Sequence, residues 1–280
     1  SQGGFRLYPE EIVPRLRFIA NAKSVGFDLS EIELKLDTGV VYAELEIAAK
    51  PVDGVHKSEA VSVGLEKIYV KQGELSFGRF DGTLADDAWI VVDGTSKAQI
   101  LQTENFAVRY AVMPGLKVSL EATSSTKATA TEAAVDSEFG LAAVYSVDVG
   151  AGDVALSAGS AGDDTAYALG FSTDIGAATL AAAYSAGTAD PKAGPKVDTT
   201  SMAVSIEYQA SEALTLEAEY GTQDTDSTVK TGATAGTKTS TFLEGTYLKA
   251  SYKVGDLTYY VKNYSKEFKN KTVLGLTASF

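Results

Sequence analysis

Two pairs of acidic side chains are the groups of this chain best suited to catalyse a reaction. Glu44 with Glu46, and Glu217 with Glu219, are spaced two residues apart. Two neighbouring carboxyl groups can act as a general acid and a general base. Each pair lies in a segment where polar and apolar residues alternate, and residues two apart point to the same face of a strand. We therefore expect these carboxylates to line a hydrated surface rather than an active site.

Other reactive groups are scarce. The chain has no cysteine and a single histidine, His56, so nucleophilic triads, disulfides and Cys/His metal sites lack their parts. It contains no G-x-S-x-G motif and no glycine-rich phosphate loop between a strand and a helix. Asp224 and Asp226 suggest calcium, but Val229 stands where an EF-hand loop beginning at Asp224 needs its glycine. We expect no enzyme activity, no metal and no cofactor.

Composition narrows the class of protein further. Acidic residues outnumber basic ones by 37 to 24, and the resulting net charge of −13 argues against nucleic acid as a partner. No apolar run of about 18 residues is present, so we expect no transmembrane helix. No proline-rich or charged linker divides the chain, which predicts a single domain over residues 1–280. No basic and apolar leader precedes it, so we expect any export signal to have been removed or never present.

Alternation of apolar and polar residues predicts the fold. In residues 116–122 and 214–220 one parity is apolar and the other carries the charge, as in a strand with two different faces. The pattern recurs in about sixteen segments joined alternately by short turns and long polar loops, which predicts an all-β, transmembrane antiparallel β-barrel that meets lipid on its outer face. The predicted strands are residues 15–22, a segment ending near 36, 41–48, 60–70, 74–81, 105–113, 116–122, 137–147, 153–158, 166–173, 177–184, 201–208, 214–220, 242–254, 257–264 and 271–280.

Residues 151–189 are rich in alanine and glycine. Leu169, Phe171, Leu180 and Tyr184 keep the strand phase through this stretch, so we predict small-residue strands rather than a disordered segment. The long polar loops are predicted at residues 124–134, 187–200 and 223–241.

One stretch of the chain carries a family resemblance. A strand ends at Gly78-Arg79, a connection of residues 82–104 follows, and the next strand carries Arg109 before a Pro-Gly turn. This layout resembles Gram-negative general diffusion porins, and the likeness covers nearly the whole chain, including Phe280. It implies a homotrimer in the bacterial outer membrane, with barrels of about sixteen strands that pass small hydrophilic solutes and ions. It also implies that the long third loop folds into the lumen.

The resemblance further implies a constriction with opposite charges on its two sides. Its basic side would be formed by Arg79, Arg109, Arg17 and Lys35, and its acidic side by Asp81, Asp86, Asp87, Asp93 and Glu31. A field between such charges screens solutes by polarity as well as size. The alternative is ordinary charge on a hydrated wall and a solvated loop. Arg79 also shares the parity of Leu75 and Phe77, so it reaches the pore only through a bulge or a swap of faces.

The inward parity carries charges of both signs. The acids are Glu31, Glu44, Glu46, Glu121, Glu207, Glu217 and Glu219, and the bases are Arg17, Lys35, Arg109, Lys117, Lys249 and Lys262. Acids slightly predominate, which predicts a mild cation preference. Aromatic belts at the membrane interfaces are predicted at Tyr208, Tyr220, Tyr259 and Phe280.

Two alternatives to a general channel stay open, and one likeness points elsewhere. A substrate-selective channel would show solute-dependent block, and a structural or adhesive surface barrel would have a plugged lumen. Residues 4–32 also resemble part of the DNA-binding domain of a MerR-type regulator. The recognition helix that should precede them is missing, and Pro14 sits badly inside a helix. We therefore interpret these residues by their strand alternation.

Overall fold

The structure is a computed structural model that describes residues 31–50, 60–80, 82–92, 106–122, 138–190, 194–230, 235–255, 257–266 and 271–278. These residues form one antiparallel sheet of 15 strands, in which each strand pairs with the next along the chain. Such a meander needs only hairpin connections. None of the described segments is a helix with the length and apolar character needed to cross a membrane.

The strand positions confirm the predicted pattern. They are β1 (Glu31–Asp37), β2 (Val41–Lys50), β3 (Ala60–Gln72), β4 (Leu75–Arg79), β5 (Phe106–Met113), β6 (Leu116–Ala122), β7 (Phe139–Asp148), β8 (Asp153–Ala161), β9 (Asp164–Ile175), β10 (Ala178–Ala189), β11 (Lys196–Gln209), β12 (Leu214–Thr228), β13 (Lys238–Val254), β14 (Leu257–Lys266) and β15 (Lys271–Ala278). A single 3₁₀ turn, η1 (Leu84–Asp86), lies between β4 and β5. The remaining predicted strand, residues 15–22, lies outside the described residues.

Two of the predicted loops are shorter than expected. Strands β10 to β13 extend into residues 187–200 and 223–241, which the polar composition had assigned to loops. The polar side chains bond to one another across the extended ladder; the Thr188 hydroxyl, for example, donates to Asp198 Oδ1 at 2.6 Å. Threonine favours strands through its branched side chain, so polarity alone gave the wrong boundary here.

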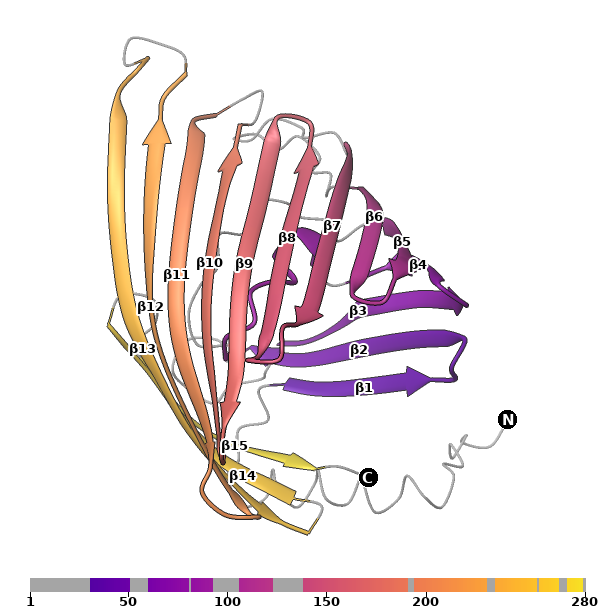
Figure 1. The fold of residues 1–280 in the computed structure, drawn as a ribbon, viewed down its shortest axis with the longest axis vertical. Helices are drawn as coiled ribbons and strands as arrows, with labels where there is room; N and C mark the ends of the chain where they lie inside the picture. Colours follow the sequence, from indigo (N-terminus) through magenta and orange to yellow (C-terminus); the bar gives the residue numbers. More distant parts are fainter. Residues whose placement is uncertain are drawn as a thin grey trace.

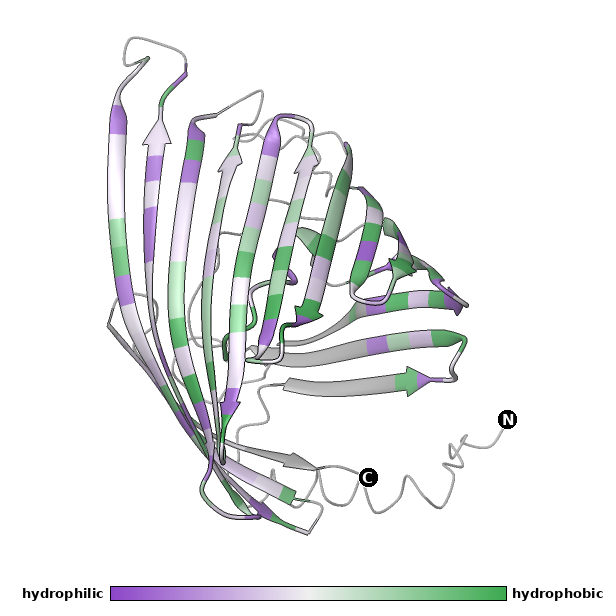
Figure 2. Cartoon of the chain, viewed as in Figure 1, coloured by the Kyte–Doolittle hydropathy of each residue, from purple (hydrophilic) through white to green (hydrophobic). Residues whose placement is uncertain are grey.

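The sheet is strongly curled (Figure 1). Strands β7 to β13 stand side by side, β1 to β3 run across them at one end, and β14 and β15 turn under them at the other. We call the face on which residues 82–92 pack the inner face, and the opposite one the outer face. Bands of apolar and polar residues alternate along the strands (Figure 2), as the period-two pattern requires.

The outer face exposes a broad set of large apolar side chains. They include Leu120, Leu141, Leu156, Leu169, Val204 and Leu248, each between 46% and 66% exposed. Soluble monomers rarely leave so large an apolar surface in water. An outer face of this kind is typical of strands that contact lipid.

Candidate functional site

Residues 82–92 leave the end of β4 and cross the inner face of the sheet. Their 3₁₀ turn contacts β6, β7, β8 and β9, and Figure 1 shows it as a dark purple ribbon behind β7 and β8. Leu84 and Ala85 are buried and form one apolar cluster with side chains of the wall. Those wall residues are Ala142, Val144, Ala161 and Ala166. The predicted inward folding of this connection is confirmed for residues 82–92.

The wall beneath this segment is built from small side chains. Ala155 and Ala168 pack against Ala88, and Gly170 lies in the same region of β9. A Cβ atom at Gly170 would collide with the Ala88 carbonyl oxygen and lie 2.5 Å from Ile90 Cγ1. The alanine and glycine content of residues 151–189 therefore has a packing reason, because the segment occupies the space that larger side chains would fill.

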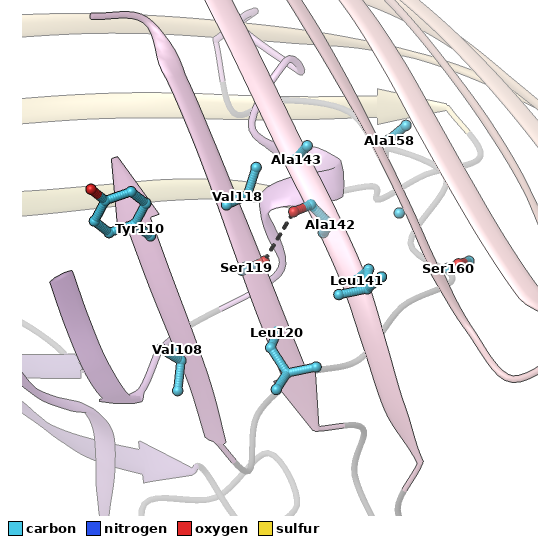
Figure 3. A pocket seen from close by; sticks show the side chains of 11 residues that line it. Val108, Tyr110, Val118, Ser119, Leu120, Leu141, Ala142, Ala143, Ala158 and Ser160 are labelled. Atoms are coloured by element: carbon cyan, nitrogen blue, oxygen red, sulfur yellow. Dashed lines mark hydrogen bonds between the residues drawn. The ribbon is translucent and has the colours of Figure 1, made fainter. Parts of the chain in front are cut away.

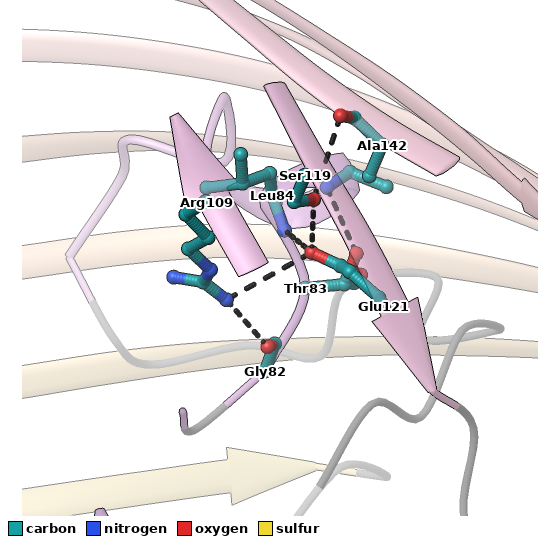
Figure 4. Close-up of polar contacts among 8 residues, drawn as sticks. Gly82, Thr83, Leu84, Arg109, Ser119, Glu121 and Ala142 are labelled. Carbon is teal, nitrogen blue, oxygen red and sulfur yellow. Dashed lines mark hydrogen bonds and ion pairs between the residues drawn. The ribbon is translucent and has the colours of Figure 1, made fainter. Parts of the chain in front are cut away.

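Glu121 on β6 is the centre of the polar cluster where the segment begins (Figure 4). The residue is 1% exposed, and its Oε1 accepts hydrogen bonds from the Leu84 amide at 3.1 Å and the Ser119 hydroxyl at 2.6 Å. Arg109 Nη2 lies 3.9 Å from the same oxygen and donates to the Gly82 carbonyl at 2.8 Å. Burying a carboxylate is costly unless donors and a counter-charge surround it. This cluster provides both.

Two serines of the wall bind the segment farther along. Ser157 on β8 donates to the Ala85 carbonyl at 2.6 Å and accepts from the Ala88 amide at 3.3 Å. Ser205 on β11 accepts from the Val92 amide at 3.3 Å. With Glu121, these bonds hold the segment at intervals from β6 to β11. Each contributes about 1 kcal/mol net, and losing one leaves a buried backbone group without its partner.

A row of stacked side chains holds the Arg109 guanidinium from the other side. Its central carbon lies 4.1 Å from the centroid of the Phe80 ring. Phe80 stacks on Tyr69 with ring centroids 4.5 Å apart, and Tyr69 stacks on Tyr42 at 5.0 Å. The Tyr42 hydroxyl donates to Glu44 at 2.7 Å. The row runs across the inner face from β2 to β5 and fixes the position of Arg109 through cation–π attraction.

The inner face of β12 to β14 has a different character. It carries large polar and aromatic side chains. Lys249 Nζ lies 2.8 Å from Glu217 Oε1, and the rings of Tyr247 and Tyr264 are tilted with centroids 5.1 Å apart. Residues 82–92 make their last wall hydrogen bond on β11.

An apolar depression of about 640 Å³ lies over β5 to β8 (Figure 3). Its lining includes Tyr110, Val118, Leu120, Leu141, Ala143 and Ala158. These residues have the parity of the outer face, opposite to Ser157 and Glu121. The depression therefore belongs to the apolar outer face and not to the inner site.

Comparison with solved structures identifies the architecture. No family model and no curated protein matches the chain. A loop-deletion mutant of OmpT, an outer membrane protein of Vibrio cholerae, superposes with a TM-score of 0.55 at 12% identity, over 88% of this chain and 87% of that chain. OmpF of Salmonella typhi, in complex with daunomycin, gives 0.55 at 13% identity over 86% and 82%. The outer membrane channel DcaP of Acinetobacter baumannii gives 0.51 at 14% identity over 86% and 80%.

The chain has a porin-like fold. The outer-membrane β-barrel architecture predicted from the alternating segments is thereby confirmed at the level of the fold.

Within this porin-like fold, three of the predicted constriction residues can be placed relative to segment 82–92. Arg109 lies on the inner face at the start of the segment. Asp86 and Asp87 lie within the segment, Asp86 buried in η1 and Asp87 exposed just after it. The carboxylate 3.9 Å from Arg109 is that of Glu121. Alternation had marked Glu121 as inward-facing, but nothing in the sequence paired it with a loop amide from residues 82–92.

Arg79 is not brought to this cluster. It lies opposite Ile68 in the β3–β4 ladder, and Phe77 lies opposite Val70, with no shift of register between them. Ile68 and Phe77 are exposed on the outer face. The bulge that would turn Arg79 inward is therefore missing, and its predicted place on the basic side of the constriction is corrected to the outer parity.

Several other predicted residues fall beyond what the structure describes. The structure does not describe Arg17, Asp81, Asp93, His56, Phe280 or residues 4–30 of the MerR-like stretch. Glu31 and Lys35 belong to β1, where the backbone of Lys35 pairs with Glu44. The belt candidates Tyr208, Tyr220 and Tyr259 are between 41% and 44% exposed on the outer face.

Metal binding finds no support among the described residues. They contain no group of three or more His, Cys, Asp or Glu side chains placed to hold an ion. Asp224 and Asp226 lie within β12, paired with β11 and β13, rather than in a calcium-binding loop.

Proposed function

We propose that this protein is a bacterial outer-membrane channel through which small hydrophilic solutes and ions diffuse passively. The observation that carries the proposal is segment 82–92, which packs on the inner face of a curled sheet whose outer face is apolar. Lipid requires closed strand pairing and an apolar exterior. A segment bound along one part of the inner wall narrows a water-filled passage and leaves the opposite wall free for solutes.

Filtering in this channel depends on size and charge rather than on chemistry. Arg109 would supply the basic side of the constriction and the exposed Asp87 the acidic side. Asp86, the other predicted loop aspartate, is only 6% exposed and would contribute less. The predicted mild cation preference for inorganic ions remains part of the proposal because the chain carries a net charge of −13. Glu44, Glu121 and Glu219 are only 1% to 3% exposed, so solutes meet less negative wall charge than the sequence suggests.

Conductance in a planar bilayer tests the proposal. Under a salt gradient we expect stepwise insertion of open channels, with a reversal potential of modest cation preference. Deletion of residues 85–92 should raise the single-channel conductance because the narrowing segment is lost. Deletion of residues 231–236, between β12 and β13, is the matched control and should change conductance much less. Clear anion selectivity would contradict the charge assignment.

The alternatives give different results in the same experiment. Reproducible insertion without current would favour a plugged structural or adhesive barrel. A substrate-selective channel would be favoured if one class of solute blocked the current at concentrations where other solutes had no effect. Equal conductance of the wild type and the 85–92 deletion would place the narrowing elsewhere.

The homotrimer is also part of the proposal, since it is implied by the porin resemblance. Its support here is the extensive apolar outer face, which suits both lipid and a second subunit. Light scattering of the detergent-purified protein, corrected for bound detergent, should give three times the mass of the chain. The mass of one chain would contradict this assignment.

A further inference from the structure

Four charged residues lie in one row across the inner face of β11 to β14. Glu207 pairs with Glu217, Glu217 with Lys249, and Lys249 with Lys262 in consecutive ladders. Directly opposed residues of an antiparallel ladder have Cβ atoms about 5 Å apart, and like charges placed this way destabilise the pair. The row therefore sets two acids side by side and two bases side by side.

Only the middle of this row is neutralised by an ion pair. Lys249 Nζ lies 2.8 Å from Glu217 Oε1, so one carboxylate compensates one of the two lysines. Among the described residues, no carboxylate lies within ion-pair distance of Lys262. Within the described part of the wall, one positive charge of the lysine pair is thus left without a counter-ion.

Aromatic rings hold the Lys262 ammonium on the wall. Its Nζ lies 5.6 Å from the centroid of the Tyr260 ring and 5.8 Å from that of Tyr264. Gly275 on β15 makes this possible, because a Cβ atom there would collide with the Tyr260 ring. Cation–π attraction keeps a lysine in place without neutralising its charge. The Tyr260 hydroxyl has no hydrogen-bond partner among the described residues and can donate to an incoming anion.

We infer that Lys262, with Lys249 and Tyr260, forms a binding site for the carboxylate group of small organic anions passing through the channel. The site rests on the proposed channel function and deepens it, because the wall of β12 to β14 is the part that segment 82–92 does not cover. A carboxylate supplies the negative charge that the lysine pair lacks and accepts hydrogen bonds from ammonium and phenol donors.

Block of single-channel current by benzoate tests the site. Benzamide, which has the same ring and no charge, is the matched solute and should not block. Lys262→Gln should weaken the block by benzoate by up to about fivefold, as expected for loss of one ion pair in a hydrated site. Lys262→Arg should retain it.

Lys71→Gln is the matched protein control. Lys71 is an exposed lysine on the inner parity of β3 that lies 5.6 Å from one tyrosine ring, that of Tyr69. Lys71 lies near one tyrosine ring instead of two, and the residue opposite it in the ladder is Ser76 instead of a lysine. Its substitution should therefore leave the block by benzoate unchanged. An equal loss of block in Lys71→Gln, or equal block by benzamide, would overturn the site while leaving the channel function intact.

Failure of the channel proposal is distinguishable from failure of the site. If the purified protein inserts without current, saturation-transfer NMR of benzoate with the solubilised protein still reports binding. A benzoate signal that is lost in Lys262→Gln and kept in Lys71→Gln would support the site without a channel. No difference between wild type and Lys262→Gln would reject it.

Discussion

Two parts of the same inner wall use opposite residue sizes. Under segment 82–92, the inner parity of β7 to β10 consists mainly of alanine, serine and glycine, and most of these residues are buried. On β12 to β14, the same parity carries Glu217, Tyr247, Lys249 and Tyr264. The backbone pairing is continuous across both parts. Small side chains on the inner face therefore coincide with the packed segment 82–92, and large polar side chains stand where that segment does not reach.

The two parts also use their charges differently. Glu121 is almost fully buried, and its carboxylate accepts a hydrogen bond from the Leu84 amide and pairs with Arg109. Glu207 is exposed on β11 and lies between Thr179 on β10 and Glu217 on β12. One carboxylate positions a backbone segment, and in the proposed channel the other would contribute to the field that solutes meet. Substitutions in each part of the wall test whether the two carboxylates differ in this way.

The largest effect is expected for Glu121→Ala. The change leaves the Leu84 amide and Arg109 without their buried acceptor, and should lower the free energy of unfolding by about 3 kcal/mol. Glu121→Gln keeps an acceptor for the amide and should cost less. Urea unfolding in detergent micelles, followed by tyrosine and tryptophan fluorescence, measures the loss.

Glu207→Ala is the control on the exposed wall. Removing an exposed charge should change the free energy of unfolding by less than about 0.5 kcal/mol, while shifting the reversal potential away from cation preference. Equal destabilisation by Glu121→Ala and Glu207→Ala would contradict the view that Glu121 positions the segment and Glu207 does not.

Overpacking the covered wall should have the next largest effect. Gly170→Leu adds a side chain where even a Cβ atom collides with Ala88 and Ile90, and should destabilise the protein by about 1 to 3 kcal/mol. It should also displace segment 82–92 and change single-channel conductance. Ala182→Leu adds bulk to the exposed outer parity of β10 and should leave conductance unchanged. A conductance change in the control alone would show that the segment does not set the passage.

Strand alternation predicted most of the fold. Parity along each strand identified both faces, the small-residue strands of residues 151–189 and the inward position of Glu121. It placed Arg79 on the parity of Phe77, which the β3–β4 ladder bears out. The family likeness alone suggested otherwise for Arg79, so local parity was the better guide.

The hydrogen-bond partners of segment 82–92 on the wall could not be predicted from strand alternation. Leu84 and Glu121 are 37 residues apart, and Ala88 and Ser157 are 69 residues apart. Pairing between a loop amide and a wall side chain depends on where the loop crosses the sheet, and no periodic pattern encodes that position. The polar runs in residues 187–200 and 223–241 were wrongly predicted to be loops. Threonine and aspartate extend a strand ladder when their side chains form hydrogen bonds across it, and the sequence pattern does not show that pairing.

Among the substitutions in the covered wall, the smallest effect is expected for Ser157→Ala. The change removes one donor to the Ala85 carbonyl and one acceptor for the Ala88 amide, and should cost about 1 to 2 kcal/mol. Hydrogen exchange should speed up at the Ala88 amide, because the segment opens locally at lower cost. Ser160→Ala, on the exposed outer parity of the same strand, should leave that amide unchanged. Equal protection of Ala88 in both variants would mean that apolar packing holds the segment without the hydroxyl. Selective loss in Ser157→Ala would show that single polar anchors of the covered wall fix the position of the segment, and with it the width left to solutes.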